Sequence, residues 1–523
     1  MARKLQPVNA SFPMGGMDVR SQKIAQPNAT SPDLQNVRSY DTIEDRSRGG
    51  QRPGLTKYTA NAAVANTRIQ DIGYTVFVNN TAPTATSIGV RNTVLTAVCD
   101  GNVYTFNTSG FTLATGGSGA LSNAAPCVFS SDAFGVTYYA DGVNQVKFTA
   151  DNTTVNTWST TAGDFPTGGV GIMPRLIASW RGRIVLSGLR TDPHNWFMSK
   201  LGDPLDWDYA PVAVTEVQAA QGGVGYVGKL GDVINSLVPY NDDVLVVGCD
   251  KSIWQMAGDP MAGGKLDLIT DKIGMAWGRP FCRDQRGTMF FFSTGARIYQ
   301  MQWGGKPEEI SEGINPEIKA TDLNTSIVRM VHDDDRDGFH VFITPLTAGA
   351  AEHWFYDQRS NGWFKDVYAS NDFNPVSCLR YLGDNERFTL IGGEDGYVRY
   401  TDDTAYTDDG TNTTSYVVLG PFMSDGAHYP HLITEIQGIL DSSSTGILYE
   451  ILSGDSPDAA LASAASPFVG EGTLGAGRSL SFQPRERSFY TYIKVGLKVN
   501  TAWAMEEVRA RMSVITSSRG RSL

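Results

Sequence analysis

Short apolar runs followed by tight turns recur along most of the chain. Each run is long enough for one buried strand, as in the stretch VLVV at 244–247. A pair such as Asp100-Gly101 often follows, and such pairs favour two-residue hairpin turns that need positive φ. The return strand then carries an aromatic residue, for example Trp254. The pattern predicts β-hairpins, and the fold class that it indicates is all-β.

The hairpin pattern repeats about seven times, and a further strand precedes most repeats. Four strands per unit, with a spacing of roughly 40–60 residues, is typical of the blades of a β-propeller. A four-stranded blade exposes two apolar faces, which its neighbours around a common axis cover. We therefore predict a propeller of about seven blades over residues 61–408. The hairpins lie at 93–106, 135–148, 182–199, 242–256, 287–301, 338–357 and 387–402.

The regions on either side of the repeats differ from them and from each other. Residues 1–60 contain many turn formers and little periodicity, which predicts an extended arm. Residues 409–523 contain about six alternating strands with a different spacing, which fits a small β-sandwich followed by a basic tail. A Gly/Ala/Ser-rich stretch at 453–478 is interpreted as a loop.

Charge is distributed unevenly along the chain. The formal net charge is −12, yet residues 1–60 hold nine Lys/Arg and five Asp/Glu and are therefore basic. A basic arm on an acidic body predicts docking onto another surface, although a solubilising tail would show the same charge. The contact residues that we predict are Arg38, Arg46, Arg48, Arg52 and Pro53. Deleting residues 1–55 is accordingly expected to leave a folded propeller.

The five cysteines are far apart and form no CxxC pair. They predict buried free thiols in a protein made in a reducing cytoplasm. The N-terminus lacks the apolar stretch of a signal peptide, and no run approaches the roughly 18 apolar residues of a membrane helix.

Motifs that carry chemistry are weak in this sequence. The stretch DDDRDG at 333–338 opens like a calcium loop, but Thr344 stands where the closing Glu belongs, so a polar hairpin is favoured. The stretch at 130–138 approaches the Asp box of sialidase-type propellers, with one residue too many. We therefore predict no catalytic, cofactor-binding or metal-binding residues, no cofactor and no enzymatic activity, although a carboxylate pair across a propeller channel stays an alternative. Recurring Tyr and Trp residues are assigned to packing between blades.

Several short sequence words resemble those of one protein family. The first sixty residues contain MGG at 14–16, PDLQNVR at 32–38 and RGGQRPGL at 48–55. The middle contains HNWF at 194–197 and, soon after it, GDPLDW at 202–207. In these words the chain resembles the tail nozzle and hub-like (tail tubular protein B-like) structural proteins of short-tailed bacteriophages.

The resemblance implies a structural protein of the virion. It would form part of the DNA-ejection conduit in the phage tail, as a ring of identical copies, a homo-hexamer, at or below the head-to-tail interface. Its partners would be tail adaptor or portal-proximal proteins, tail fibre or spike proteins, and genomic DNA that passes through the lumen without specific binding. Assembly would take place in the host cytoplasm, without membrane insertion.

Two other functions stay open from the sequence. One is a propeller adhesin that binds or degrades host glycans, and the other is a structural protein of the head surface. An acidic body repels DNA, which suits a conduit wall but also fits most acidic proteins.

Overall fold

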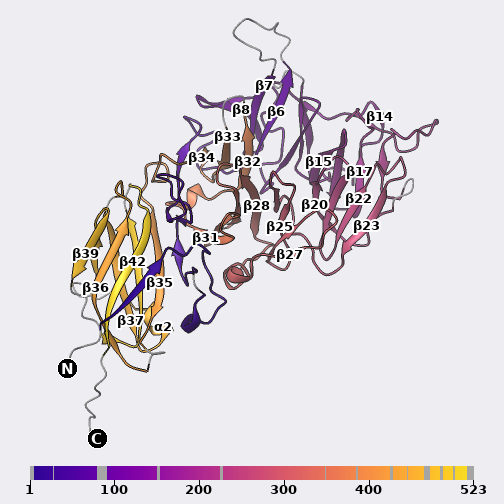
Figure 1. Cartoon of the computed structure of the whole chain (residues 1–523). Coiled ribbons are helices and arrows are strands. Elements are labelled where there is room, and N and C mark those ends of the chain that lie inside the picture. Colours follow the sequence, from indigo (N-terminus) through magenta and orange to yellow (C-terminus); the bar gives the residue numbers. More distant parts are fainter. Residues whose placement is uncertain are drawn as a thin grey trace, which may run out of the picture.

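The computed structural model describes residues 5–27, 29–78, 91–149, 153–223, 228–347, 349–383, 387–424, 428–444, 446–463, 471–482, 487–498 and 501–514. Two β domains lie side by side, a propeller and a C-terminal sandwich (Figure 1). Helical elements in these ranges are short: η1 (Lys23–Ala25), η2 (Glu312–Ile314), α1 (Asn315–Ile318), η3 (Asn371–Phe373) and α2 (Pro457–Leu461). The predicted all-β fold class is confirmed.

The propeller consists of seven four-stranded antiparallel sheets, so the predicted number of blades is confirmed. At six of the seven junctions between adjacent sheets, the innermost strands of the two sheets pack against each other. The first three blades contain β6 (Ile69–Val78), β7 (Arg91–Cys99), β8 (Asn102–Asn107) and β9 (Gly110–Leu113); β10 (Phe129–Ala133), β11 (Val136–Ala140), β12 (Gln145–Phe148) and β13 (Val155–Thr157); and β15 (Leu176–Trp180), β16 (Arg183–Leu189), β17 (Asp192–Met198) and β19 (Ala220–Gln221).

The fourth to sixth blades are also built from consecutive stretches of chain. They contain β20 (Ile234–Pro239), β21 (Val244–Cys249), β22 (Ile253–Ala257) and β23 (Lys265–Thr270); β24 (Phe281–Arg283), β25 (Met289–Phe292), β26 (Ile298–Met301) and β27 (Glu308–Glu309); and β28 (Ser326–Asp333), β29 (Gly338–Pro345), β30 (Glu352–Asp357) and β31 (Gly362–Asp366). A two-stranded parallel pair, β14 (Ala162–Gly163) with β18 (Asp206–Trp207), joins the segment before the third blade to the connection between the third and fourth strands of that blade.

The seventh blade is closed by a strand from the other end of the chain. Its first three strands are β32 (Ser377–Leu382), β33 (Arg387–Gly392) and β34 (Val398–Asp402). The outermost strand is β5 (Gly54–Lys57), which pairs antiparallel with β34. Residues 54–57 therefore belong to the propeller, and the domain boundary predicted at residue 60 falls after its first strand.

Hairpin turns form where the sequence pattern places them. Asp100 (φ 52°) and Gly101 (φ 70°) make the turn between β7 and β8, and both have the positive φ that this turn type needs. Phe134 (φ 53°) and Gly135 (φ 72°) do the same between β10 and β11, in the stretch that approaches an Asp box. That stretch is therefore a blade hairpin.

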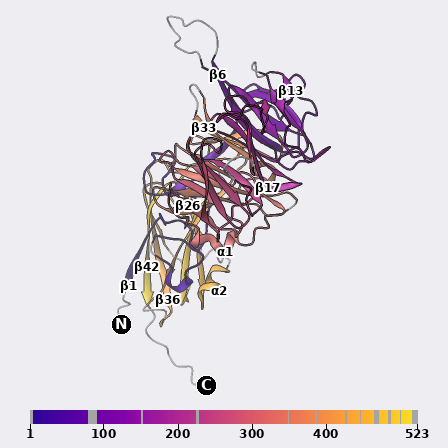
Figure 2. The same ribbon diagram turned by 90° about the vertical axis from the view of Figure 1, so that its right-hand side faces the viewer.

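The C-terminal domain is a sandwich of two five-stranded sheets, which confirms its predicted architecture. Both sheets take an edge strand from the N-terminal part of the chain, as Figure 2 shows for β1 beside β42. One sheet contains β1 (Leu5–Ser11), β42 (Met505–Val514), β36 (His431–Leu440), β39 (Arg478–Phe482) and β40 (Arg487–Ser488). The other contains β2 (Leu34–Gln35), β35 (Thr414–Phe422), β41 (Tyr490–Lys498), β37 (Ile447–Gly454) and β38 (Glu471–Leu474).

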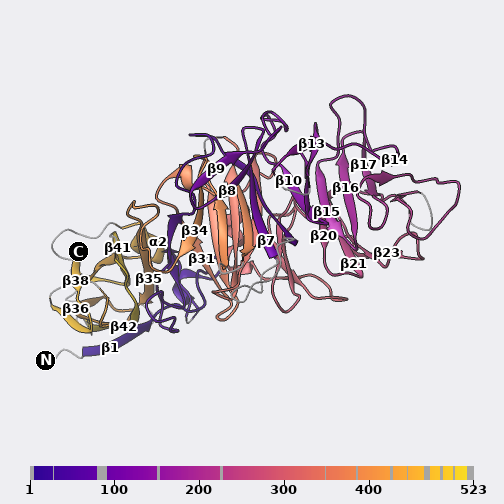
Figure 3. The same cartoon turned by 90° about the horizontal axis from the view of Figure 1, so that it is seen from above.

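Residues 5–57, here called the N-terminal segment, begin with β1 on the sandwich and continue to the propeller, where they end in β5 (Figure 3). Besides β1, β2 and β5 they form a small pair, β3 (Val37–Arg38) with β4 (Gly50–Gln51). The predicted separate arm is corrected: the segment completes both domains, and deletion of 1–55 would remove part of the seventh blade. The basic tail predicted at residues 516–523, after the sandwich, lies outside the described residues.

Candidate functional site

Two arginines cross the centre of the propeller. Arg329 lies on β28, in the sixth blade, and its Nη2 donates a hydrogen bond to the carbonyl oxygen of Val128 at 3.3 Å. Arg279 precedes β24, in the fifth blade, and its guanidinium donates to the carbonyl oxygen of Ser130. Both acceptors lie at or beside β10, in the second blade, on the opposite side of the axis. At this level side chains therefore bridge the axis.

Asp71 is the counter-charge to these arginines. Its Oδ2 accepts a hydrogen bond from the Ser130 hydroxyl at 2.6 Å, and its Oδ1 lies 3.8 Å from Arg329 Nη2. Burial raises the pKa of the Asp71 carboxyl, because the loss of hydration outweighs the attraction of Arg279 and Arg329. Burial also lowers the pKa of Arg279. The group is a compact charged cluster with more arginines than carboxylates.

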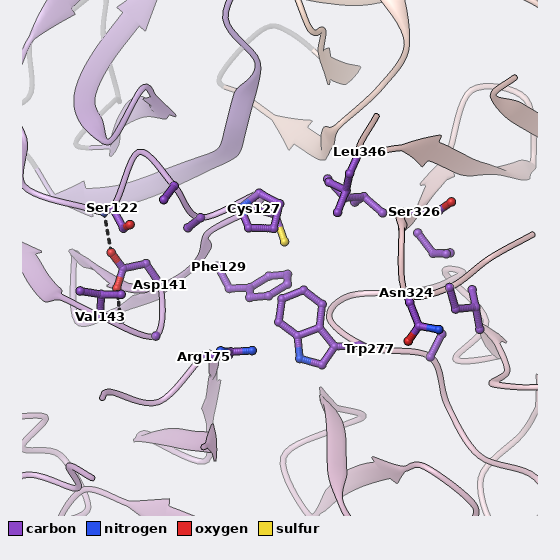
Figure 4. Close-up of a pocket in the computed structure, with 18 of the residues that line it drawn as sticks. Ser122, Cys127, Phe129, Asp141, Val143, Arg175, Trp277, Asn324, Ser326 and Leu346 are labelled. Carbon is purple, nitrogen blue, oxygen red and sulfur yellow. Dashed lines mark hydrogen bonds between the residues drawn. The ribbon is translucent and has the colours of Figure 1, made fainter. Parts of the chain in front are cut away.

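A pocket of about 530 Å³ includes Arg329 in its lining; we call it the axial pocket. Its walls come from segments that lead into the innermost strands and from turns between second and third strands, which all lie at one end of the blades. Phe129 and Trp277 lie next to each other in it, with Arg175 on one side and Asn324 on the other (Figure 4).

Two arginine side chains contact Phe129, one of the aromatic residues that line the axial pocket. The Arg329 guanidinium carbon lies 4.6 Å from the centroid of the Phe129 ring, and that of Arg279 lies 5.5 Å away. Trp277 packs edge-to-face on Phe129 with their centroids 5.2 Å apart. Phe129 is buried, whereas Trp277 is 39% exposed. An indole that is partly exposed and supported from behind is a surface for a flat or ring-shaped ligand.

Charges around the axial pocket are predominantly positive. Arg175 and Arg190 are exposed lining residues, and within the described residues their guanidinium groups make no hydrogen bond or ion pair. Asp141 is the carboxylate among the lining residues, and its oxygens accept backbone N–H groups of Ser122 and Val143, each at 2.7 Å. The pocket can therefore offer free positive charge to an anion.

A second set of charged residues joins the N-terminal segment to the two domains. Arg38 makes a bidentate ion pair with Asp366 of β31, with both N–O distances 2.7 Å. Arg52 makes another with Asp408, at 3.0 and 2.7 Å, in the chain that connects propeller and sandwich. All four side chains are buried. Burial alone would raise the pKa of Asp366, but Arg38 and Arg52 hold it below its usual range.

Asn36 and Arg48 extend this set of contacts into the sandwich. Asn36 Nδ2 donates to the carbonyl oxygens of Val367 in the propeller, at 2.9 Å, and Thr414 in the sandwich, at 2.8 Å. Arg48 is buried, and its Nη1 lies 2.7 Å from Asp441 Oδ2, beyond β36. The segment therefore links the domains through hydrogen bonds as well as strands.

The structure thus places the predicted docking residues differently from expectation. Arg38, Arg48, Arg52 and Pro53 are buried within the chain, and the first three pair with its own carboxylates. They are brought together as internal contacts, which corrects the expectation that these arginines face a partner. Arg46 is different: its side chain is 59% exposed, 3.3 Å from Glu44 and 3.8 Å from Glu506.

Two glycines in the family-like words occupy backbone positions that exclude a side chain. Gly16 has φ +71°, and a Cβ there would lie 2.2 Å from the Trp363 carbonyl oxygen in the propeller. Gly49 has φ +78°, and its Cβ would lie 2.1 Å from the Phe12 ring. The words MGG and RGGQRPGL therefore mark close packing of the N-terminal segment.

Other predicted features have plain structural roles. The DDDRDG stretch is a hairpin between β28 and β29, and Arg336 pairs with Asp333 at 2.7 Å. Among described residues, no three His, Cys, Asp or Glu side chains are grouped so as to hold a metal ion. All five cysteines are free, and burial raises the pKa of Cys99 to about 12. Of the helices in the described ranges, none has the length and apolar character that crossing a bilayer requires.

The axial cluster was not predicted from the sequence. One signal was present, because Arg329 interrupts the apolar run IVRMV that forms an innermost strand. A charged residue at such a position must find a partner inside the propeller. The carbonyl oxygens that accept its hydrogen bonds belong to Val128 and Val376, which are 201 and 47 residues away in the chain. Partners so distant leave no signal in the sequence near Arg329.

No protein-family model and no curated protein matches this sequence. In fold it is similar to the extracellular domain of the two component system protein BT3049 from B. thetaiotaomicron, with a TM-score of 0.44, 10% identity, and 88% of this chain and 57% of that chain covered. It is also similar to YCF48 bound to D1 peptide, with a TM-score of 0.36, 13% identity, and 67% and 99% covered. The chain spans 43% and 59% of two structures of the BT4673 extracellular domain. These similarities carry no inference about function.

Proposed function

We propose that this chain is a structural protein of a bacteriophage tail, a nozzle- or hub-like subunit of the DNA-ejection conduit. In this role it acts without catalysis, as one of a ring of identical copies, a homo-hexamer, that contacts adaptor or portal-proximal proteins on one side and fibre or spike proteins on the other. Its place of action is the virion.

The observation that carries the proposal is the position of the short sequence stretches that resemble the tail nozzle and hub-like proteins. MGG, PDLQNVR and RGGQRPGL contain the residues by which the N-terminal segment joins the propeller to the sandwich, through Arg38, Arg52 and Asn36. A conduit subunit must keep its shape while DNA under pressure passes it. Buried bidentate ion pairs, and strands that one segment contributes to the sheets of both domains, suit that requirement because they resist relative movement.

The two arginines that bridge the propeller axis limit the path that DNA could take. Arg279 and Arg329 reach across the propeller to the second blade, so a duplex has no open path along the propeller axis. DNA would therefore pass through the centre of a ring of several copies, outside each propeller. The acidic character of the chain, with a net charge of −12, favours weak repulsion and easy sliding at such a wall.

The test is a cryo-EM reconstruction, without imposed symmetry, of the virions that contain this chain. We expect a small ring of copies around the tail axis, with the propeller and sandwich both in the wall. Copies spread over the capsid would instead establish a head-surface protein. Copies confined to fibre tips would establish an adhesin, and absence from purified particles would reject a virion role.

A further inference from the structure

We propose that the axial pocket binds an acidic sugar, such as a uronic acid or sialic acid unit. Arg175 and Arg190 would hold its carboxylate, and Trp277 would contact the face of its ring. The inference goes beyond the proposed function and does not depend on it, because it concerns one pocket of the propeller wherever the chain acts.

The first argument is unbalanced charge. Among the described residues, three arginines line the axial pocket, and its one lining carboxylate, Asp141, is already bonded to backbone N–H groups. Arg329 at the base is partly balanced by Asp71, but Arg175 and Arg190 have no partner in the described ranges. On a chain of net charge −12 this is a local positive site. Guanidinium groups bind carboxylates in bidentate fashion, which makes a carboxylate the favoured anion.

The second argument is a preformed aromatic wall. Trp277 rests edge-to-face on Phe129, and the guanidinium carbons of Arg329 and Arg279 lie 4.6 and 5.5 Å from the centroid of the Phe129 ring. The indole is thus fixed in place before a ligand arrives, which reduces the entropy lost on binding. It is 39% exposed, unlike the fully buried Trp196 and Trp354 at blade positions. Packing inside the propeller explains the presence of Trp196 and Trp354, but it leaves part of the Trp277 side chain exposed.

The third argument is size and polarity. A pocket of about 530 Å³ falls within the roughly 300–1,000 Å³ of small-ligand sites. Ser326 and Asn324 place a hydroxyl and an amide in the same wall, which suits the hydroxyl groups of a sugar. Single-stranded nucleic acid is a poorer fit, because it needs a groove that follows several phosphates and stacks successive bases.

The experiment is a calorimetric titration of the purified full-length chain. The probes are glucuronic acid and N-acetylneuraminic acid, with glucose as the neutral sugar and inorganic phosphate as the simple anion. The test variants are Arg175→Gln/Arg190→Gln and Trp277→Ala; these side chains are exposed, so both variants should fold, and thermal melting checks that they do.

Matched controls come from a pocket at the other end of the blades. Arg286, whose side chain is 72% exposed, and Trp303, which is 55% exposed, line a pocket formed at turns between first and second strands and between third and fourth strands. Arg286→Gln and Trp303→Ala therefore change the same residue types away from the axial pocket. Binding by these two variants should equal that of the wild type.

We expect saturable binding of at least one acidic sugar by the wild type. Each test variant should bind that sugar about tenfold or more weakly, and the wild type should bind glucose about tenfold or more weakly, as the loss of a charge-assisted contact implies. Failure of both acidic sugars to bind overturns the inference. So does equal binding of glucose, equal binding of phosphate, or equal loss in the control variants. None of these results depends on the location of the chain in a virion, so the inference and the proposed function can fail separately.

Discussion

The propeller and the sandwich both use the N-terminal segment, but they use it differently. Six of the seven blades are each made from one continuous stretch of the sequence, and the propeller takes one short strand, β5, to complete its last sheet. The sandwich takes the edge strand of both of its sheets, β1 and β2, from the same segment. The propeller is thus largely a local structure, whereas the sandwich is assembled from the two ends of the chain.

This difference shows where the chain is vulnerable. Arg38, Arg48 and Arg52 each make a buried ion pair with a carboxylate of the propeller, the sandwich or the connection between them. Removing the arginines leaves buried carboxylates without a partner, which costs more than the pair contributed. Removing the whole segment should therefore destabilise both domains, whereas removing β1 alone should destabilise only the sandwich.

The largest expected effect comes from deleting residues 1–57. We expect no soluble, folded chain, because the seventh blade loses its outer strand and Asp366 and Asp408 lose their arginines. Deleting residues 1–11 is the matched control, since it removes β1 only. That chain should stay soluble, with a protease-resistant propeller. Limited proteolysis and circular dichroism distinguish the two, and a folded propeller in the longer deletion would contradict the prediction.

Arg52→Met should destabilise the chain by about 3–5 kcal/mol, because it leaves the buried Asp408 carboxylate unpaired. Arg46→Gln should cost about 0–1 kcal/mol, because the Arg46 side chain is 59% exposed and solvent screens its ion pairs. Urea unfolding of each variant measures the difference. Similar midpoints for the two variants would show that the domain connection does not depend on the buried pair.

Gly49→Ala should cost about 2–4 kcal/mol, from the positive φ and from displacement of the Phe12 ring. Gly119→Ala in the propeller is the control: it has φ +59°, but no atom lies within 4 Å of the place that its Cβ would take, so only the backbone strain of about 1–2 kcal/mol remains. Unfolding midpoints should separate the two substitutions. Equal losses of stability in the two variants would mean that the Phe12 ring is displaced at no cost in free energy.

The smallest expected effect is the pH dependence from Asp366. Its pKa is lowered in the folded chain, so its contribution to stability is present above the unfolded pKa, about 3.9, and is lost as the pH falls through the folded value. The gap in urea midpoint between wild type and Asp366→Asn should therefore narrow as the pH falls below about 4. A gap that stays constant down to acid unfolding would exclude this carboxylate as a source of acid sensitivity.

The blades could be predicted because their contacts are local. The further strands expected before the hairpins at 182–199 and 242–256 correspond to β15 and β20. They could be predicted because each repeat shows its apolar runs and its turn in nearby residues. The sandwich strands after residue 409 were predicted for the same reason. The interpretation of residues 453–478 as a loop was wrong in part, because a short helix, α2, and an edge strand of the sandwich, β38, lie within that stretch.

Long-range contacts could not be predicted from one sequence. Arg52 and Asp408 are 356 residues apart, and nothing near Arg52 distinguishes a buried ion pair from an exposed docking residue. The same holds for the axial pocket, whose walls come from several blades. Turn formers in residues 1–60 correctly predicted an extended backbone but left its partners unspecified.

The closure of the seventh blade by β5 has a consequence for synthesis. Lys57 leaves the ribosome 345 residues before Asp402, the last residue of the strand that β5 pairs with. At about 5–20 residues per second, β5 waits roughly 20–70 s for its partner. β1 waits longer still, because its partner β42 ends at Val514. A chain that ends before residue 402 can thus complete neither domain, and one that ends between residues 402 and 514 lacks part of the sandwich. Both domains are complete only in chains that extend to Val514.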